Sequence, residues 1–147
     1  MCSGKTTLGR MMARDEGLEF IDLDEYIEQR EGKSVSDIFR EKGESGFREI
    51  ERQSLREVSE KENCVIACGG GTPCFFDNMD FMNSCGETIF LESSEEVLLD
   101  RLLKYGSLRP IVAGKSKDEI LEIIRRQMDE RKKFYDQAKR KLNTDWL

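Results

Sequence analysis

The chain has 147 residues, 37% of them charged and 37% hydrophobic, with a net charge of −6 and a pI near 4.9. This length suits a single domain with its own core over residues 1–147, and the acidic balance argues against a nucleic-acid surface. No apolar run approaches the length of a membrane span and no signal peptide is seen, so we expect neither nucleic acid nor membrane as a partner.

The start of the chain carries its most informative motif. Residues 1–7 read M-C-S-G-K-T-T, the end of a phosphate-binding loop of the form G-x-x-x-x-G-K-[ST]. In that motif Gly4 allows close approach of the backbone, Lys5 reaches the β- and γ-phosphates, Thr6 ligates Mg²⁺ and Thr7 hydrogen-bonds a phosphate. The alternative is a chance S-G-K-T-T at the start of a helix.

Helical and strand patterns then alternate along the chain. This alternation predicts βαβ units, and hence an α/β fold with a parallel sheet covered by helices on both faces. The strands are expected at 18–23, 64–68, 88–91 and 141–145. The helices are expected at 5–16, 24–30, 34–41, 44–61 (with a break at Gly43), 77–84, 95–104 and 118–139. A polar loop is expected between the last two helices.

Two carboxylates, Asp22 and Asp24, stand at the end of the first predicted strand. A spacing of two puts both on one side of a strand, and ligands of open α/β sheets bind beyond the carboxyl ends of the strands. One acid could hold Mg²⁺ or its waters, and the other could accept a hydroxyl proton. The alternative is a pair of solvated turn residues.

The next candidates lie on the predicted helix 44–61 and after the second predicted strand. Arg48 and Glu51 are three residues apart and share a helix face, either as part of a site or as a surface ion pair. The run Gly69, Gly70, Gly71 loses much conformational entropy on folding, so it needs a reason. Bare backbone facing a ligand is one reason, and a tight turn is the other.

Two further arginines are candidates in the second half of the chain. Arg109 lies in the polar loop and suits a lid over a transferring phosphate, although a solvated loop charge is the alternative. Arg131 falls in register with the apolar stripe of the last helix, so it either pairs with a buried acid or faces a ligand.

Histidine is absent, and the number of cysteines, five, is odd, with no C-x-x-C pair. The lack of histidine excludes Ser–His and Cys–His nucleophilic chemistry and most catalytic zinc sites. The cysteine pattern indicates reduced thiols in the cytoplasm. A general base here must be a carboxylate, a lysine or a tyrosine.

In chain order these motifs resemble the shikimate kinase family. They are S-G-K-T-T at 3–7, D-L-D at 22–24, G-F-R-E-I-E at 46–51, I-A-C-G-G-G at 66–71, L-R-P-I at 108–111 and R-K-K-F-Y-D-Q-A at 131–138. The resemblance implies a P-loop, nucleoside-monophosphate-kinase-like three-layer α/β/α fold with strand order 2-3-1-4-5. It also implies transfer of the ATP γ-phosphoryl group to the 3-hydroxyl of shikimate, with Mg²⁺, in the biosynthesis of chorismate and aromatic amino acids. We expect a monomer.

The resemblance also implies roles for single residues. Those implied to be catalytic are Lys5, Asp24 and Arg109. Those implied to bind shikimate are Asp24, Arg48, Glu51 (by orienting an arginine), Gly69, Gly70, Gly71 and Arg131. Those implied to bind ATP are Ser3, Gly4, Lys5, Thr6, Thr7, Arg101 and Arg109, with Thr6 and Asp22 at the metal.

The sequence departs from the family at both ends. The family's first strand, the opening glycine of its phosphate loop and its C-terminal segment have no counterpart here. We therefore expect a gap in the sheet between the strands at 64–68 and 88–91, and an inactive, poorly folded product if residues 1–147 are expressed alone. The alternatives for function are a related small-molecule kinase of the gluconate type, or a catalytically inactive shikimate-binding module.

Overall fold

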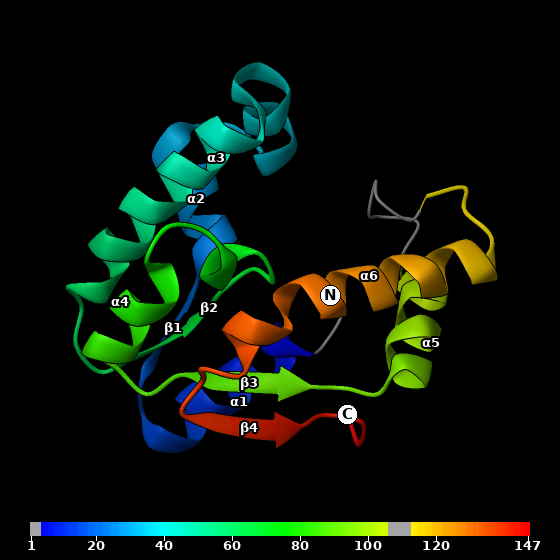
Figure 1. The fold of residues 1–147 in the computed structure, drawn as a ribbon. Coiled ribbons are helices and arrows are strands. Elements are labelled where there is room, and N and C mark those ends of the chain that lie inside the picture. Colours follow the sequence, from blue (N-terminus) through cyan, green and yellow to red (C-terminus); the bar gives the residue numbers. More distant parts are fainter. Residues whose placement is uncertain (1–3, 106–112) are drawn as a thin grey trace. The chain divides into compact units, whose positions relative to one another are not determined.

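A computed structural model covers residues 1–147 and describes residues 4–105 and 113–147. Contacts divide the chain into two compact units, one of Lys5–Cys85 and one of Gly86–Leu147 together with the first residues. Figure 1 shows the elements of both units, and each unit is described by itself below.

In the Lys5–Cys85 unit, two short strands pair in parallel. Strand β1 (Glu19–Asp22) lies beside β2 (Cys64–Ala67), with Glu19 opposite Cys64 and Asp22 opposite Ala67. Helix α1 (Lys5–Glu16) packs against both strands. Because parallel strands end at the same edge, the segments that follow β1 and β2 begin close together.

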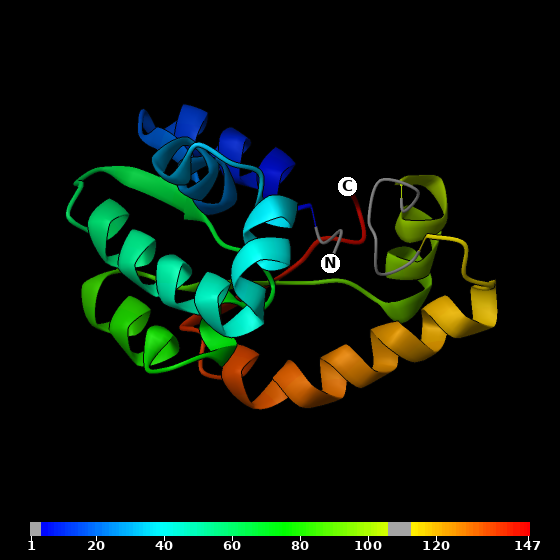
Figure 2. The same cartoon turned by 90° about the horizontal axis from the view of Figure 1, so that it is seen from above.

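Helices α2 (Leu23–Glu31) and α3 (Val35–Ser59) pack on each other. Asp22 caps the start of α2, and Ser34 caps the start of α3 through its side chain. Helix α3 bends at Gly43, which has φ 70° and ψ −178°, a conformation that favours glycine. Figure 2 shows the change of direction. The unit's buried core is built from Ile21, Leu23, Ile27, Ile38, Phe47, Ile50, Leu55 and Val58.

After β2 the chain forms a short 3₁₀ turn, η1 (Thr72–Cys74), and then helix α4 (Asn78–Cys85). Thr72, Pro73, Asn78 and Met79 are all buried in this segment. The segment therefore packs against the rest of the unit and does not form a solvated loop.

In the Gly86–Leu147 unit, β3 (Ile89–Glu92) and β4 (Arg140–Asn143) also pair in parallel. Helix α5 (Glu95–Tyr105) packs against α6 (Lys117–Tyr135). A capping box starts α6, in which Ser116 and Glu119 each bond the other's backbone. The buried core of this unit consists of Leu98, Leu99, Leu102, Ile120 and Ile124.

The predicted α/β class with parallel strands is confirmed, as is the break at Gly43. Among the described residues the strands form two separate pairs, β1 with β2 and β3 with β4. The predicted single domain stays a prediction. No described helix is long and apolar enough to cross a membrane.

One boundary in the second unit was wrong. Helix α6 was expected to reach residue 139, but it ends at Tyr135 and β4 starts at Arg140. Asp136 forms the C-cap, and its carboxylate bonds both Lys132 and Lys141 at 2.8 Å. Residues 140–143 instead pair with β3, and this tertiary pairing overrides the helix propensity of the sequence that follows α6.

Candidate functional site

The loop–helix junction that the phosphate-binding motif predicts is present. Lys5 is the first residue of α1, and the preceding Gly4 has φ 86°, in the region that favours glycine. Lys5 is half-buried, whereas Thr6 and Thr7 are exposed. A helix N-terminus with exposed hydroxyl groups suits an anionic ligand. Ser3 lies outside the described residues.

Asp22 and Asp24 occupy different kinds of position. Asp22 ends β1, and its Oδ1 accepts hydrogen bonds from the backbone N–H groups of Asp24 at 2.9 Å and Glu25 at 3.2 Å. Asp24 therefore lies in the first turn of α2. The expectation that spacing along a strand sets both carboxylates on one side was wrong, because the strand ends between them.

The Asp24 carboxyl lies among charges from several elements. Burial raises its pKa above the ordinary value, and the nearby Lys5 ammonium opposes that rise. Asp22 and Glu28 raise the pKa further, while Arg48 lowers it. A carboxyl with a raised pKa beside cationic groups is typical of a proton acceptor in a site.

Arg48 and Glu51 form a buried pair on α3. Arg48 Nη1 donates to Glu51 Oε1 at 2.9 Å, and the Glu51 side chain is only 1% exposed. The Arg48 guanidinium also lies over the ring of Phe75, with Cζ 4.2 Å from the ring centroid. The alternative of a surface ion pair was wrong, because the Glu51 side chain is buried and the Arg48 side chain is only 12% exposed.

The glycines that follow β2 border these side chains. A Cβ atom on Gly69 would lie 3.8 Å from Asp24 Oδ1, and one on Gly71 would lie 2.6 Å from Arg48 Nη2. Gly71 has φ −87°, which any residue can adopt. At Gly71 the reason for glycine is therefore the close approach of the guanidinium.

These contacts bring together the candidates of the Lys5–Cys85 unit. Lys5, Asp22, Asp24, Arg48 and Glu51 all act on one another or on the thiol of Cys68, directly beyond β2. Burial raises the pKa of that thiol to about 12. The site lies where the carboxyl ends of parallel strands predict it.

The remaining arginine candidates belong to the Gly86–Leu147 unit. Arg101 on α5 donates from Nη2 to the Thr144 carbonyl at 2.6 Å and from Nη1 to Ser93 Oγ at 3.2 Å, which ties the segments after β3 and β4. Arg131 is half-buried on the apolar side of α6, as its register predicts. Arg109 lies outside the described residues. Their roles toward ligands stay predictions.

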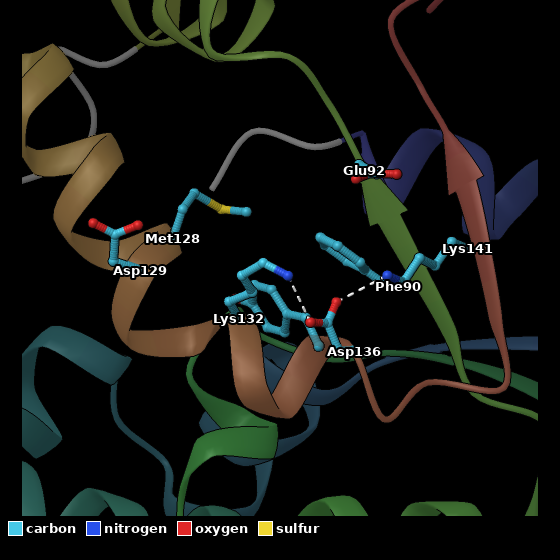
Figure 3. A pocket seen from close by; sticks show the side chains of 8 residues that line it. Phe90, Glu92, Met128, Asp129, Lys132, Asp136 and Lys141 are labelled. Atoms are coloured by element: carbon cyan, nitrogen blue, oxygen red, sulfur yellow. Dashed lines mark hydrogen bonds and ion pairs between the residues drawn. The ribbon is translucent and has the colours of Figure 1, made fainter.

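A cavity of about 250 Å³ in the Gly86–Leu147 unit was not predicted (Figure 3). Its lining combines apolar side chains of β3 and α6 with a triad in which Lys132 and Lys141 both bond Asp136. These two lysines lower the pKa of the Asp136 carboxyl to about 2. Both lysines are already paired with Asp136, so we assign the triad a structural role at the turn between α6 and β4 and no ligand.

Sequence reasoning missed the polar residues that support the buried pair. Thr72 Oγ1 donates to Glu51 Oε2 at 2.8 Å, and Asn78 Nδ2 donates to the Thr72 carbonyl at 2.9 Å. Thr72 directly follows the glycines, and that adjacency was the available signal. Asn78 gave no comparable signal.

A comparison with protein families places the whole chain in a known group. The family model described as "Shikimate kinase" matches residues 1–145. The chain belongs to the shikimate kinase family. The resemblance predicted from the motifs is thereby confirmed.

Individual relatives agree with the family match. A shikimate kinase of Phocaeicola vulgatus is 49% identical over 147 residues, which are 100% of this chain and 84% of the relative. A crystal structure of shikimate kinase from Bacteroides thetaiotaomicron superposes with a TM-score of 0.95 at 50% identity, covering 99% of this chain and 82% of that one. Shikimate kinase from Acinetobacter baumannii in complex with shikimate gives a TM-score of 0.84 at 30% identity, covering 95% and 76%.

We predict that Gly71→Ala lowers the free energy of unfolding by about 1–3 kcal/mol, measured by urea denaturation. The new methyl group would displace the Arg48 guanidinium, which cannot move without weakening its bond to Glu51. Gly69→Ala is the matched control, because its Cβ would make only ordinary contacts, at 3.5 Å or more. Equal losses in the two variants would contradict the steric role of Gly71.

Proposed function

We propose that this protein transfers the γ-phosphoryl group of ATP to the 3-hydroxyl of shikimate. Membership of the shikimate kinase family supports this activity. The observation that carries the proposal is the convergence of Lys5, Asp24 and the Arg48–Glu51 pair around the glycines after β2. This arrangement offers a phosphate-binding cation, a proton acceptor and a carboxylate-binding cation in one place.

The reaction uses these groups in distinct roles. Asp24 takes the proton of the 3-hydroxyl as its oxygen forms a bond to the γ-phosphorus, and the bond from that phosphorus to the bridging oxygen of ADP breaks. Lys5 binds the β- and γ-phosphates, and we propose that Arg109 neutralises charge on the transferring group. Arg48 binds the shikimate carboxylate, and Glu51 orients Arg48. The family resemblance implies the same ligand for Arg131.

Mg²⁺ is the cofactor that this chemistry implies. Asp22 uses Oδ1 to cap α2, and its Oδ2 accepts no hydrogen bond from the described residues. That oxygen and the exposed Thr6 hydroxyl are hard donors of the kind that Mg²⁺ prefers. Among the described residues there is no cluster of three or more His, Cys, Asp and Glu side chains, so much of its shell would be water and phosphate. Bound Mg²⁺ would neutralise charge on the phosphates.

Other features of the proposal follow from the sequence. We propose that the protein works in the cytoplasm as a monomer. None of the four described cysteines forms a disulfide, which supports the reducing compartment.

The first test is a coupled assay of ADP release with shikimate, gluconate and a nucleoside monophosphate in parallel. We expect ADP release with shikimate alone, and release with another substrate but not with shikimate would refute the proposal. The assay is run on residues 1–147 and on a fusion that adds the N-terminal segment of the Bacteroides thetaiotaomicron relative. Activity in the fusion alone would bear out the expectation that the sequence needs a preceding strand, and the variants below are measured in the active form.

Replacement of Asp24 by Asn should lower turnover by about 10²-fold or more, because the amide keeps the shape but cannot accept the proton. Turnover near that of the wild type would leave Asp24 with hydroxyl binding only.

The pH profile supplies the control for this role. Activity should fall as the pH drops through the raised pKa of Asp24, because the base must be ionised. Glu28→Gln removes a negative charge that raises this pKa, so it should move the acid limb to lower pH. Glu25→Gln, on the exposed side of the same helix, should leave the limb in place.

Replacement of Arg131 by Ala should weaken shikimate binding far more than ATP binding, as measured by calorimetry with each ligand separately. The reason is the loss of charge-assisted hydrogen bonds to the substrate carboxylate. Arg125→Ala on the same helix is the control, because Arg125 is exposed and pairs with Glu95. Equal losses of both ligands in Arg131→Ala would indicate a structural role.

A further inference from the structure

The buried Glu51 carboxylate is shared between two donors. Its Oε1 accepts from Arg48 Nη1 at 2.9 Å, and its Oε2 accepts from Thr72 Oγ1 at 2.8 Å. The Glu51 side chain is 1% exposed and Thr72 is fully buried. Each oxygen therefore has its own protein partner, and neither is left for water.

The Thr72 hydroxyl is held in place by its own backbone. The Thr72 N–H donates to the Gly69 carbonyl at 3.1 Å, and the Thr72 carbonyl accepts from Asn78 Nδ2 at 2.9 Å. Asn78 is fully buried at the start of α4. The hydroxyl thus reaches Glu51 from a fixed turn at the end of the glycine run.

This arrangement limits how Glu51 meets the guanidinium. An arginine and a carboxylate commonly pair through two parallel hydrogen bonds. Because Thr72 engages Oε2, the closest contact between Glu51 and Arg48 uses Oε1 and Nη1 alone. The ring of Phe75, 4.2 Å from Arg48 Cζ, covers the guanidinium, and Gly71 leaves room for it.

The other terminal nitrogen of Arg48 faces an exposed partner. Nη2 lies 3.5 Å from Glu44 Oε1, at the limit of a hydrogen bond, and the Glu44 side chain is 60% exposed. A contact so long and so solvated is weak. A ligand carboxylate can therefore replace Glu44 at Nη2 at little cost.

We propose that Thr72 is a positioning residue for substrate binding. Its hydroxyl hydrogen-bonds Glu51 Oε2, so that this oxygen does not pair with Arg48. Arg48 Nη2 therefore stays available for the carboxylate of the substrate. Without the hydroxyl, the Glu51 carboxylate rotates into a two-point pair with Arg48 and competes with the substrate. This inference rests on the proposed function and deepens it.

The test compares Thr72→Val, which keeps the shape but lacks the donor, with Thr72→Ser, which keeps the donor. In Thr72→Val the KM for shikimate should rise about tenfold or more, the order expected for a lost charge-assisted contact. The KM for ATP and kcat should stay within about twofold. Thr72→Ser should restore the KM for shikimate. Thr72→Ala takes the place of the valine variant if the latter does not fold.

Ser54→Ala is the matched control. Ser54 is buried on α3, the helix that carries Glu51, and its hydroxyl has no hydrogen-bond partner in the described structure. This variant should leave both KM values unchanged. In a protein that already carries Glu51→Gln, adding Thr72→Val should raise the KM for shikimate little further, since Thr72 acts through Glu51.

The outcomes separate this inference from the proposed function. If the wild type forms no shikimate-dependent ADP, both fail. If the wild type is active but Thr72→Val keeps its KM for shikimate, or Thr72→Ser is as impaired as Thr72→Val, only the positioning role fails. An equal rise in KM for shikimate and ATP would indicate general loss of structure and would also overturn it.

Discussion

The Lys5–Cys85 unit is organised around one carboxylate that has left water. Burying an ionised group costs several kcal/mol unless charge and hydrogen bonds compensate for it. Glu51 meets this condition with a cation from its own helix and a hydroxyl from η1. The requirement links α3 to the turn after the glycines, so these two segments are held together by the need to satisfy a single group.

The attachment of η1 and α4 to α3 extends along the helix. Arginines spaced by four lie over three aromatic rings: Arg48 over Phe75 at 4.2 Å, Arg52 over Phe76 at 4.9 Å and Arg56 over Phe81 at 4.5 Å. Arg56 also pairs with Asp77 at 3.0 Å. Each contact is weak alone, about 0.5–1 kcal/mol at an exposed position, but together they fix the alignment of the two segments. The inner contact supports the site, while the outer two lie nearer the solvent.

Much of this could be predicted from sequence because the relevant patterns are local. The alternation of helix and strand, the bend at Gly43 and the pairing of Arg48 with Glu51 follow from spacing and from backbone preferences. The reason for Gly71 could not be predicted, because it depends on a guanidinium more than twenty residues earlier in the chain. Thr72 was missed for the same reason: its partner lies on another element. The place of Arg131 on α6 was predictable, whereas its ligand depends on contacts outside that helix.

The thiol beyond β2 has a consequence for the chemical handling of this protein. Alkylating agents and peroxides attack the thiolate, and a thiol whose pKa is raised to about 12 is almost never ionised near neutrality. The half-buried Cys68 should therefore react with maleimide and peroxide more slowly than an ordinary thiol, although it lies beside the charged groups of the candidate site. The exposed Cys85, at the far end of α4, is open to reagents. A fluorophore or spin label attached there would report on the protein while leaving the thiol in the site untouched.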